Sequence, residues 1–291
     1  MIVLLCWLRH YMKHTTLKLS LIIVGGLILR LALLTFIQNP GLNDQNHYYN
    51  LGQRLIDGDG FTIDYVWHYS SVPDDIVHPI DHWMPLAGVA VALGMSLGGE
   101  TAQGALLVFI FAGTLLPILM FGATKQLNGS DTAALMAALF TATLPDFVWN
   151  SLRSDTTILN IVFITVGVLM LNEGLVKRRW WAFVFSGFSV GLAYVTRNDS
   201  IVFLPMLIVV LALYLWKRRD KVSRRAIGLA MVLIPVVFAL TISPWMIRNQ
   251  QELGMLGTAE SSRMFFMVDQ RDHYAYDTPL TLSTMLEQQT I

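Results

Sequence analysis

Long apolar runs separated by short polar stretches make up most of this chain. At 1.5 Å per residue, about 20 residues of helix cross the hydrocarbon core of a bilayer, which is about 30 Å thick. Runs close to this length recur at residues 17–37, 102–123, 131–148, 156–173, 180–196, 200–216 and 226–243. The pattern predicts an all-α integral membrane protein with about seven transmembrane helices.

One segment, residues 38–84, interrupts this pattern because it is long and neither apolar nor basic. It is rich in Asp, His, Tyr and Trp. Polar loops held on a rigid scaffold commonly carry binding and catalytic residues. We therefore expect the chemistry of the protein to lie in this loop.

The apolar stretch that follows, residues 85–99, is short for a membrane span, since its apolar part covers only about 20 Å as a helix. If it crossed the membrane, the basic clusters at 177–179 and 217–225 would both face outside. Basic loops are retained in the cytoplasm, so we expect a surface or re-entrant helix instead. Residues 38–101 then form one outer loop with juxtamembrane helices.

Basic residues near the N-terminus predict the orientation of the first span. Arg9, Lys13 and Lys18 precede it, which places the N-terminus in the cytoplasm and the polar loop on the outer face. We assign residues 1–250 to one membrane-embedded module and residues 251–291 to an outer-face tail. Short loops favour a bacterial plasma membrane over the endoplasmic reticulum.

Arg30 lies in the middle of the first span. A charge at this depth costs roughly 2.5–3.5 kcal/mol on insertion scales, so such residues usually face the interior of a bundle or a wet cavity. The alternative is a long side chain that reaches the membrane surface. We expect Arg30 to face the interior.

Composition narrows the classes of function. The formal net charge is zero, which gives no basis for nucleic-acid binding. Cys6 is the only cysteine, so the chain has no internal disulfide. A transporter would favour several ionisable groups at mid-bilayer, whereas the acids here gather at one surface.

The predicted topology brings four polar groups to the outer face: Asp44, Asp155, Arg197-Asn198-Asp199 and Arg248-Asn249. A carboxylate can act as general base on a hydroxyl or amine. An arginine can hold a phosphate with two parallel hydrogen bonds and stabilise its charge as it leaves. At a membrane surface, these groups together indicate chemistry on a lipid phosphate.

Each of these residues also has a structural interpretation. Ser154-Asp155-Thr156 is a good N-terminal helix cap, so Asp155 alone favours capping. Arg197 and Arg248 alone favour anchoring of helix ends at the interface. Asp44 alone is one of many solvated loop acids. The shared location of the four groups is what favours a functional site.

A metal site is a further alternative in the polar loop. His78 and His82 are four residues apart, and on one helical turn they could bind a divalent ion. Pro79 and the lack of a clear third ligand disfavour this arrangement. We therefore predict no metal or other cofactor.

Several motifs resemble those of the GT-C membrane glycosyltransferases, in the branch of protein O-mannosyltransferases and aminoarabinose transferases. They follow one another along residues 17–250, and Gly52 stands where an Ala is usual. The motifs are Asp44-x3-Tyr48-x3-Gly52 with Gly58-x-Gly60-Phe61, His82-Trp83-Met84-Pro85-Leu86 with Gly98-Gly99, Ser154-Asp155, the stretch from Gly191 to Arg197, and Pro244-Trp245-Met246-Ile247-Arg248-Asn249.

The resemblance implies transfer of a sugar from a polyprenyl-phosphate carrier to a protein or lipid acceptor on the non-cytoplasmic face. It makes Asp44 the base for the acceptor, and Asp155 a residue that binds the acceptor or orients the site. Arg197 and Arg248 hold the phosphate of the carrier. The remaining substrate-binding candidates are Tyr48, His82, Trp83 and Asn198.

The chain departs from the family in one respect, because family members usually continue with further spans and a soluble domain. We expect the chain to be a truncated module that contains residues 1–250. A partner chain that supplies the missing helices is one alternative. A non-catalytic membrane subunit, or a remnant of such an enzyme, is the other.

Overall fold

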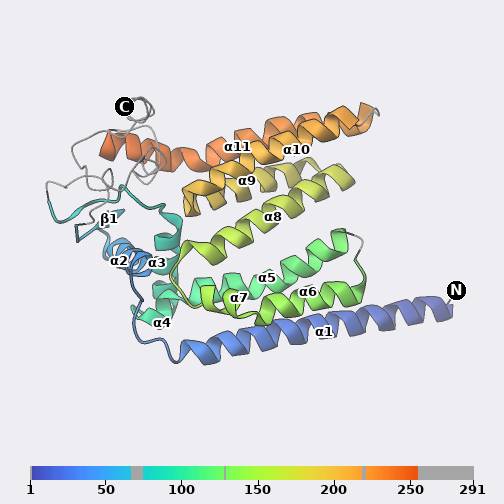
Figure 1. The fold of residues 1–291 in the computed structure, drawn as a ribbon, viewed down its shortest axis with the longest axis horizontal. Helices are drawn as coiled ribbons and strands as arrows, with labels where there is room; N and C mark the ends of the chain where they lie inside the picture. The colour runs from blue at the N-terminus through green and yellow to red at the C-terminus, as the bar shows by residue number, and fades with distance from the viewer. Residues whose placement is uncertain (1, 67–74, 128, 218–220, 255–291) are drawn as a thin grey trace, which may run out of the picture.

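The computed structural model describes residues 2–66, 75–127, 129–217 and 221–254. Most of these residues form a bundle of long helices that lie side by side, with smaller elements gathered at one end (Figure 1). Most of the predicted outer tail, from residue 255 onward, is outside the described residues. The all-α prediction is confirmed for the described residues apart from one short hairpin.

The helices of the bundle, together with two short segments that continue them, run back and forth between its two ends (Figure 1). They are α1 (Ile2–Leu34), α5 (Leu107–Gln126), α6 (Asp131–Thr143), α7 (Pro145–Asn150), α8 (Thr156–Lys177), α9 (Trp180–Thr196), the 3-10 helix η1 (Asn198–Val202), α10 (Phe203–Lys217) and α11 (Lys221–Leu253). The smaller elements are α2 (Asp44–Asp57), strands β1 (Thr62–Ile63) and β2 (His78–Pro79), α3 (Leu86–Gly98) and α4 (Ala102–Ala105).

The predicted count of seven spans is corrected by the lengths of the helices. Among the described residues, five helical stretches are long and apolar enough to cross a membrane: His14–Leu34, Ala102–Gln126, Thr156–Lys177, Asn198–Lys217 and Ser223–Leu253. These stretches are enough to make the chain a multi-pass integral membrane protein. The other two predicted spans, 131–148 and 180–196, form shorter apolar helices.

The short length of each of these two helices has a physical reason. Helix α6 stops after 13 residues because Leu144 has a non-helical backbone, with ψ at 131°. The next residue, Pro145, has no N–H and disfavours a helical residue before it. Helix α9 has 17 residues, and its ends are basic or polar at Arg179 and Arg197.

Helices α2 and α3 pack at the end of the bundle rather than along it (Figure 1). Their close contact depends on small residues, because a side chain at Gly52 would clash with Val91 and one at Gly88 would clash with Leu51. Helix α3 was expected to lie on the surface or re-enter, and its position at the bundle end agrees with that expectation. This packing fixes the first turn of α2, which begins at Asp44.

Strands β1 and β2 pair antiparallel and are anchored to α11. The Arg248 side chain donates hydrogen bonds to the carbonyl oxygens of Ile80, at 2.7 Å, and Phe61, at 2.8 Å. The Arg248 guanidinium also lies over the Trp245 ring, 4.8 Å from its centroid. The hairpin therefore holds its place through contacts far apart in the sequence.

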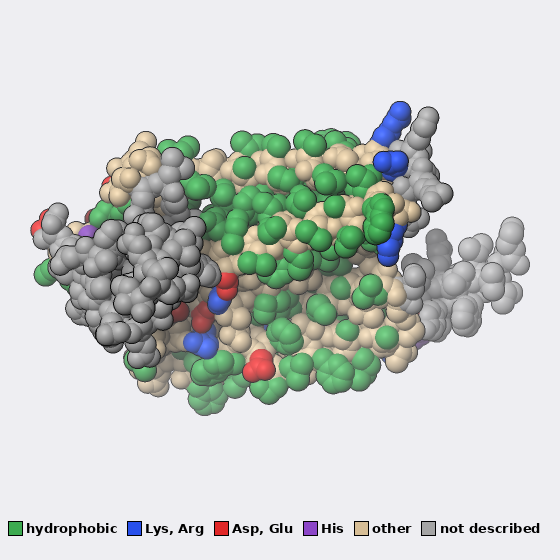
Figure 2. Space-filling view, turned by 45° about the horizontal axis from the view of Figure 1, so that its top comes forward, with side chains coloured by type: hydrophobic (Ala, Val, Ile, Leu, Met, Phe, Trp, Pro, Cys, Tyr) green, Lys and Arg blue, Asp and Glu red, His purple; other side chains and the backbone are tan. Residues whose placement is uncertain are grey.

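Apolar side chains cover the middle of the bundle surface, while the charged residues visible in Figure 2 lie mainly toward its two ends. Large exposed apolar residues include Leu21, Ile28, Leu213, Val232 and Leu240. Exposed apolar surface of this extent is typical of helices that face lipid.

Arg30 is fully buried, so the expectation that it faces the interior is confirmed. Its guanidinium donates to the carbonyl oxygens of Gly26 and Ala142 and to Ser151 Oγ, each at 3.0 Å. The usual helical partner of the Ala142 carbonyl would be the N–H of Asp146, which lies beyond the break at Leu144. Arg30 thus supplies a donor where the chain interrupts its own helix.

Candidate functional site

A cavity of about 160 Å³ lies at the end of the bundle that carries α2 and α3. Residues from the start of α2, the segment before α3, the start of α8 and the end of α9 line it. They are Asp44, Tyr48, His82, Trp83, Met84, Thr156, Thr196, Arg197 and Asn198. The structure therefore brings together six of the eight site residues predicted from the sequence.

Asp44 occupies the first turn of α2, where the positive end of the helix dipole favours a carboxylate. Loss of solvation nevertheless raises its pKa, and repulsion from Asp155 raises it further. Arg197, Arg153 and a hydrogen bond from Trp83 act in the opposite direction. A carboxylate whose pKa is raised accepts a proton more readily, which suits a general base.

Asp155 is the N-cap of α8, as the structural interpretation of its sequence suggested. Its side chain accepts a hydrogen bond from the Thr157 N–H at 3.1 Å and forms an ion pair with Arg153 at 3.3 Å. It does not line the cavity, but its charge acts on both Asp44 and Arg197. A role for Asp155 in the reaction stays a prediction.

Arg197 follows the last residue of α9 with an extended backbone, which turns the chain across the cavity wall. Its Nε and Nη2 donate to the two carboxylate oxygens of Asp199, at 3.2 and 2.9 Å. Its Nη1 donates to Thr156 Oγ1 at 3.3 Å. The hydrogen bond with Asp199 is the main reason that the Arg197 pKa is raised, so the guanidinium stays charged.

Aromatic residues form one part of the cavity wall. Tyr48 is buried, and burial raises its pKa well above the usual range, so its phenol is neutral. The rings of His82 and Trp83 meet edge to face with centroids 4.3 Å apart. Such a wall offers flat apolar surface together with hydrogen-bond donors.

Sequence reasoning missed His47, which supports this wall from behind. Its ring lies 4.1 Å from that of Trp83, and its Nδ1 is 2.7 Å from the Tyr65 hydroxyl. Burial lowers the pKa of His47 to about 3, so it is neutral at physiological pH. Its position one helical turn after Asp44 was the available signal.

Three further lining residues were also missed, namely Met84, Thr156 and Thr196. Each is the immediate neighbour of a predicted residue: Trp83, Asp155 or Arg197. Their side chains complete the walls rather than adding charge.

The structure does not bring Arg248 to this cavity. Its guanidinium is engaged with the hairpin carbonyls described above and with Asn249 Oδ1 at 3.0 Å. Arg248 therefore supports the chain segment that leads to His82. Its predicted contact with a phosphate stays a prediction.

The helical pair considered for a metal does not form. His78 lies in β2, and His82 follows in a non-helical segment before α3. Within the described ranges, no group of three or more His, Cys, Asp or Glu residues is arranged to hold a metal ion.

The fold and the cavity define a class: a multi-pass membrane protein with a carboxylate and an arginine facing one cavity at the end of its bundle. Residues 77–246 match the family described as dolichyl-phosphate-mannose-protein mannosyltransferase. The match covers more than half of the chain, which therefore belongs to this family of lipid-linked-sugar-dependent GT-C glycosyltransferases. The resemblance noted from the motifs is confirmed.

The matched region includes His82, Trp83, Asp155, Arg197 and Arg248, but it begins after Asp44 and Tyr48. The placement of the latter two in the site rests on the geometry alone. A comparison with curated proteins gives no match.

Proposed function

We propose that the protein transfers a sugar from a polyprenyl-phosphate carrier to a protein or lipid acceptor, with the reaction in the cavity described above. Family membership supports the class of donor. The observation that carries the residue assignment is that Asp44 and Arg197 line the same cavity. Asp44 supplies a base, and Arg197 supplies a cation that can bind the phosphate.

In the proposed reaction, Asp44 removes the proton from the acceptor hydroxyl or amine as that group attacks the anomeric carbon of the sugar. The bond from this carbon to the phosphate oxygen breaks on the opposite face, so the configuration inverts. Polyprenyl phosphate leaves with the bonding electrons. Arg197 stabilises the charge that develops on the phosphate, an electrostatic role that often dominates catalysis.

The other residues of the cavity have supporting roles in this proposal. Tyr48 donates a hydrogen bond from its neutral phenol, and His82 and Trp83 pack against the sugar. Asn198 contributes polar contacts beside Arg197. The charge of Asp155 tunes Asp44 and Arg197 together, and the contacts of Arg248 favour an anchoring role.

The distribution of basic residues supports an orientation. The end of the bundle opposite the cavity carries most of the visible cations at the right of Figure 2, and its loops include Lys125, Lys177, Arg178, Arg179 and Lys217. Basic loops stay in the cytoplasm. We therefore propose that the cavity opens on the non-cytoplasmic face of a bacterial plasma membrane.

Transfer of radiolabelled sugar from a panel of polyprenyl-phosphate donors, in membranes that contain the full 291-residue chain, tests the proposal. We expect Asp44→Asn to lower transfer by about 10²–10⁴-fold, the usual contribution of a general base. Asp57→Asn, at the other end of α2, is the matched control and should leave transfer unchanged.

Equal transfer by wild type and Asp44→Asn would remove Asp44 from the mechanism. Absence of transfer from a well-inserted wild-type chain, across the whole donor and acceptor panel, would instead favour a non-catalytic subunit. Restoration of transfer by added membrane extract would then indicate a partner chain.

A further inference from the structure

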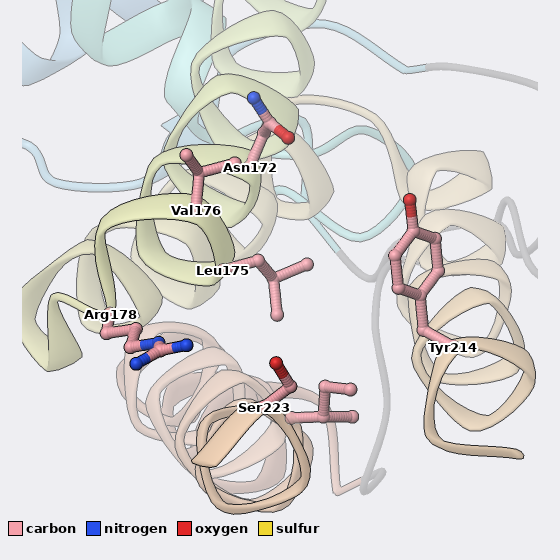
Figure 3. Close-up of a pocket in the computed structure, with 7 residues that line it drawn as sticks. Asn172, Leu175, Val176, Arg178, Tyr214 and Ser223 are labelled. Carbon is pink, nitrogen blue, oxygen red and sulfur yellow. The ribbon is translucent and has the colours of Figure 1, made fainter. Parts of the chain in front are cut away.

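A second cavity, of about 270 Å³, lies near the opposite end of the bundle. We call this the basic end: the end at which α8 and α10 finish and α9 and α11 begin. The cavity is bounded by the end of α8, by α10 and by the start of α11 (Figure 3). Its lining residues are Asn172, Leu175, Val176, Arg178, Tyr214, Ser223 and Ile227. None of them belongs to the catalytic cavity.

The walls of this cavity have an amphipathic character. Figure 3 shows Arg178 and Ser223 on one side of the space, with Tyr214 on α10 across from them. Leu175, Val176 and Ile227 supply the apolar part of the lining. A ligand with a polar head and an apolar tail fits such a lining better than a free polar solute does.

Arg178 gives the cavity a positive charge that no acidic side chain among the described residues pairs with. Its neighbours on both sides are paired with Glu173, Lys177 at 2.9 Å and Arg179 at 3.2 Å. Arg178 itself forms no ion pair or hydrogen bond with any residue that the structure describes. Its fork of N–H donors is therefore available for a phosphate.

The backbone of Arg178 is also unusual, with φ at 57° and ψ at 39°. This left-handed conformation costs a residue other than glycine about 1–2 kcal/mol, and Gly or Asn is common at this position after a helix. Strained backbone of this kind often accompanies ligand binding. An arginine here gives up local stability while it places its guanidinium at the cavity.

Tryptophans mark the depth of the cavity in the membrane. Trp180 and Trp181 start α9, and Trp216 is near the end of α10, so all three lie toward the basic end. Trp216 is 81% exposed and Trp180 is 63% exposed. Exposed tryptophans gather at the level of lipid head groups, so the cavity lies where phospholipid phosphates are found.

We propose that this cavity binds the phosphodiester head group of an anionic phospholipid from the leaflet at the basic end. Arg178 contacts the phosphate, while Ser223 and Tyr214 line the polar side. The upper part of the lipid tail lies against Leu175 and Val176. This site is independent of the sugar-transfer proposal, because it uses other residues and another end of the bundle.

Native mass spectrometry of the full chain, titrated with phosphatidylglycerol, tests the proposal. We expect Arg178→Asn to weaken binding of the first phosphatidylglycerol by about tenfold, the effect of losing one charge-assisted contact. Asparagine tolerates the left-handed backbone, so the fold is retained. Phosphatidylcholine, whose choline cation offsets the charge of the phosphate, should bind the wild type more weakly than phosphatidylglycerol does.

Arg179→Asn is the matched control, because it removes the same charge from the next residue, where the guanidinium is paired with Glu173. It should leave the affinity nearly unchanged. Equal weakening by both variants would overturn the proposal in favour of diffuse attraction to anionic lipid.

A second arm separates a lipid from a free anion. Inorganic phosphate at millimolar concentration should not displace phosphatidylglycerol from the wild type. Displacement that is absent in Arg178→Asn would instead assign the cavity to a free phosphate. Sugar transfer by Arg178→Asn should equal that of wild type, so the outcome here is separate from that of the catalytic test.

Discussion

The two ends of the helix bundle each hold a cavity with an arginine in its wall, but the arginines have different neighbours. Arg197 is held by Asp199 and lies in a cavity with Asp44. Arg178 has no acidic partner among the described residues. Mixed charge at one end suits the proton transfer and phosphate stabilisation that we propose there, whereas a positive charge without a described acidic partner suits anion binding alone. The neighbours of an arginine, more than its presence, therefore indicate its function.

Arg30 adds a third case between the two ends. It is fully buried, and each of its hydrogen-bond partners among the described residues is an uncharged oxygen, either a backbone carbonyl or the Ser151 hydroxyl. Arg30 lines neither of the two cavities described above. Its hydrogen bonds join α1 to the broken helix formed by α6 and α7, so its role is to position the chain.

The largest effect that we predict is a loss of sugar transfer in Arg197→Gln, which would sharpen the comparison between the two ends of the bundle. Loss of one preorganised charge at a developing oxyanion typically lowers turnover by about 10²–10³-fold. Arg197→Lys should restore little of the activity, because an ammonium cannot reproduce the fork that meets Asp199 and Thr156. Steady-state assays in which the concentrations of donor and acceptor are varied separately check this prediction. The change in the kinetic parameters should appear when the donor is varied.

If Arg178→Gln lowered transfer as much as Arg197→Gln does, the distinction between the two ends would fail. The two variants make the same chemical change, so each is the control for the other. Equal expression and insertion of both must be measured in the same membranes.

A smaller effect is expected on stability from Ser151→Ala, which removes one acceptor from buried Arg30. A buried donor left without its partner costs about 1–3 kcal/mol. The loop that follows also carries Ser154, whose hydroxyl donates to the Gln45 carbonyl oxygen at 3.1 Å next to Asp44. We therefore expect a lower unfolding temperature in detergent and weaker transfer together.

Ser96→Ala is the matched control for this change, since Ser96 lies exposed on α3 and bonds only the Ala92 carbonyl of its own helix among the described contacts. Its unfolding temperature should match that of wild type. A Ser151→Ala variant as stable as wild type would contradict the positioning role of Arg30.

The acid limb of the pH–rate profile provides a third test, specific to the cavity end. In the proposed reaction, transfer requires the Asp44 carboxylate, so we expect activity to fall as pH falls through its raised pKa. Asp155→Asn removes a like charge and should move this limb to lower pH. Arg153→Gln removes an attractive charge and should move it to higher pH.

His47 adds no limb near neutral pH to this profile, because its pKa of about 3 keeps it neutral there. Shifts of the same sign in the two variants would show that Asp44 is not the group that titrates. Arg178→Asn, at the other end, should leave the profile in place.

Much of the candidate catalytic cavity could be predicted from the sequence, because helices that run back and forth return their connecting residues to the same end. Asp44, Tyr48, Trp83 and Arg197 meet for this reason. The position of Arg248 could not be predicted in this way, because it depends on individual hydrogen bonds. Arg248 bonds the carbonyls of Phe61 and Ile80, which are far from it in the sequence, and no motif announces a bond to a backbone oxygen.

The number of spans was overestimated because hydropathy does not register a break in a helix. Residues 131–148 are apolar throughout most of their length, yet Leu144-Pro145 divides them into α6 and α7. The hairpin β1–β2 has only two residues in each strand, too few for an alternating pattern. The cavity at the basic end depends on how α8, α10 and α11 pack against one another, and this packing could not be predicted from the sequence pattern.

The smallest predicted effect compares the residues that end α8 and α9. Arg178 has a left-handed backbone, whereas Arg197 is extended, with φ at −144°. Asparagine adopts the left-handed conformation more easily than arginine does, so Arg178→Asn should raise the free energy of unfolding by up to about 1 kcal/mol. Arg197→Asn should lower it, since its hydrogen bonds to Asp199 and Thr156 are lost. Unfolding of both variants in the same detergent measures the difference in sign. A loss of stability in Arg178→Asn would mean that the guanidinium holds the α8–α9 loop, and that its exposure at the cavity serves the fold rather than a ligand.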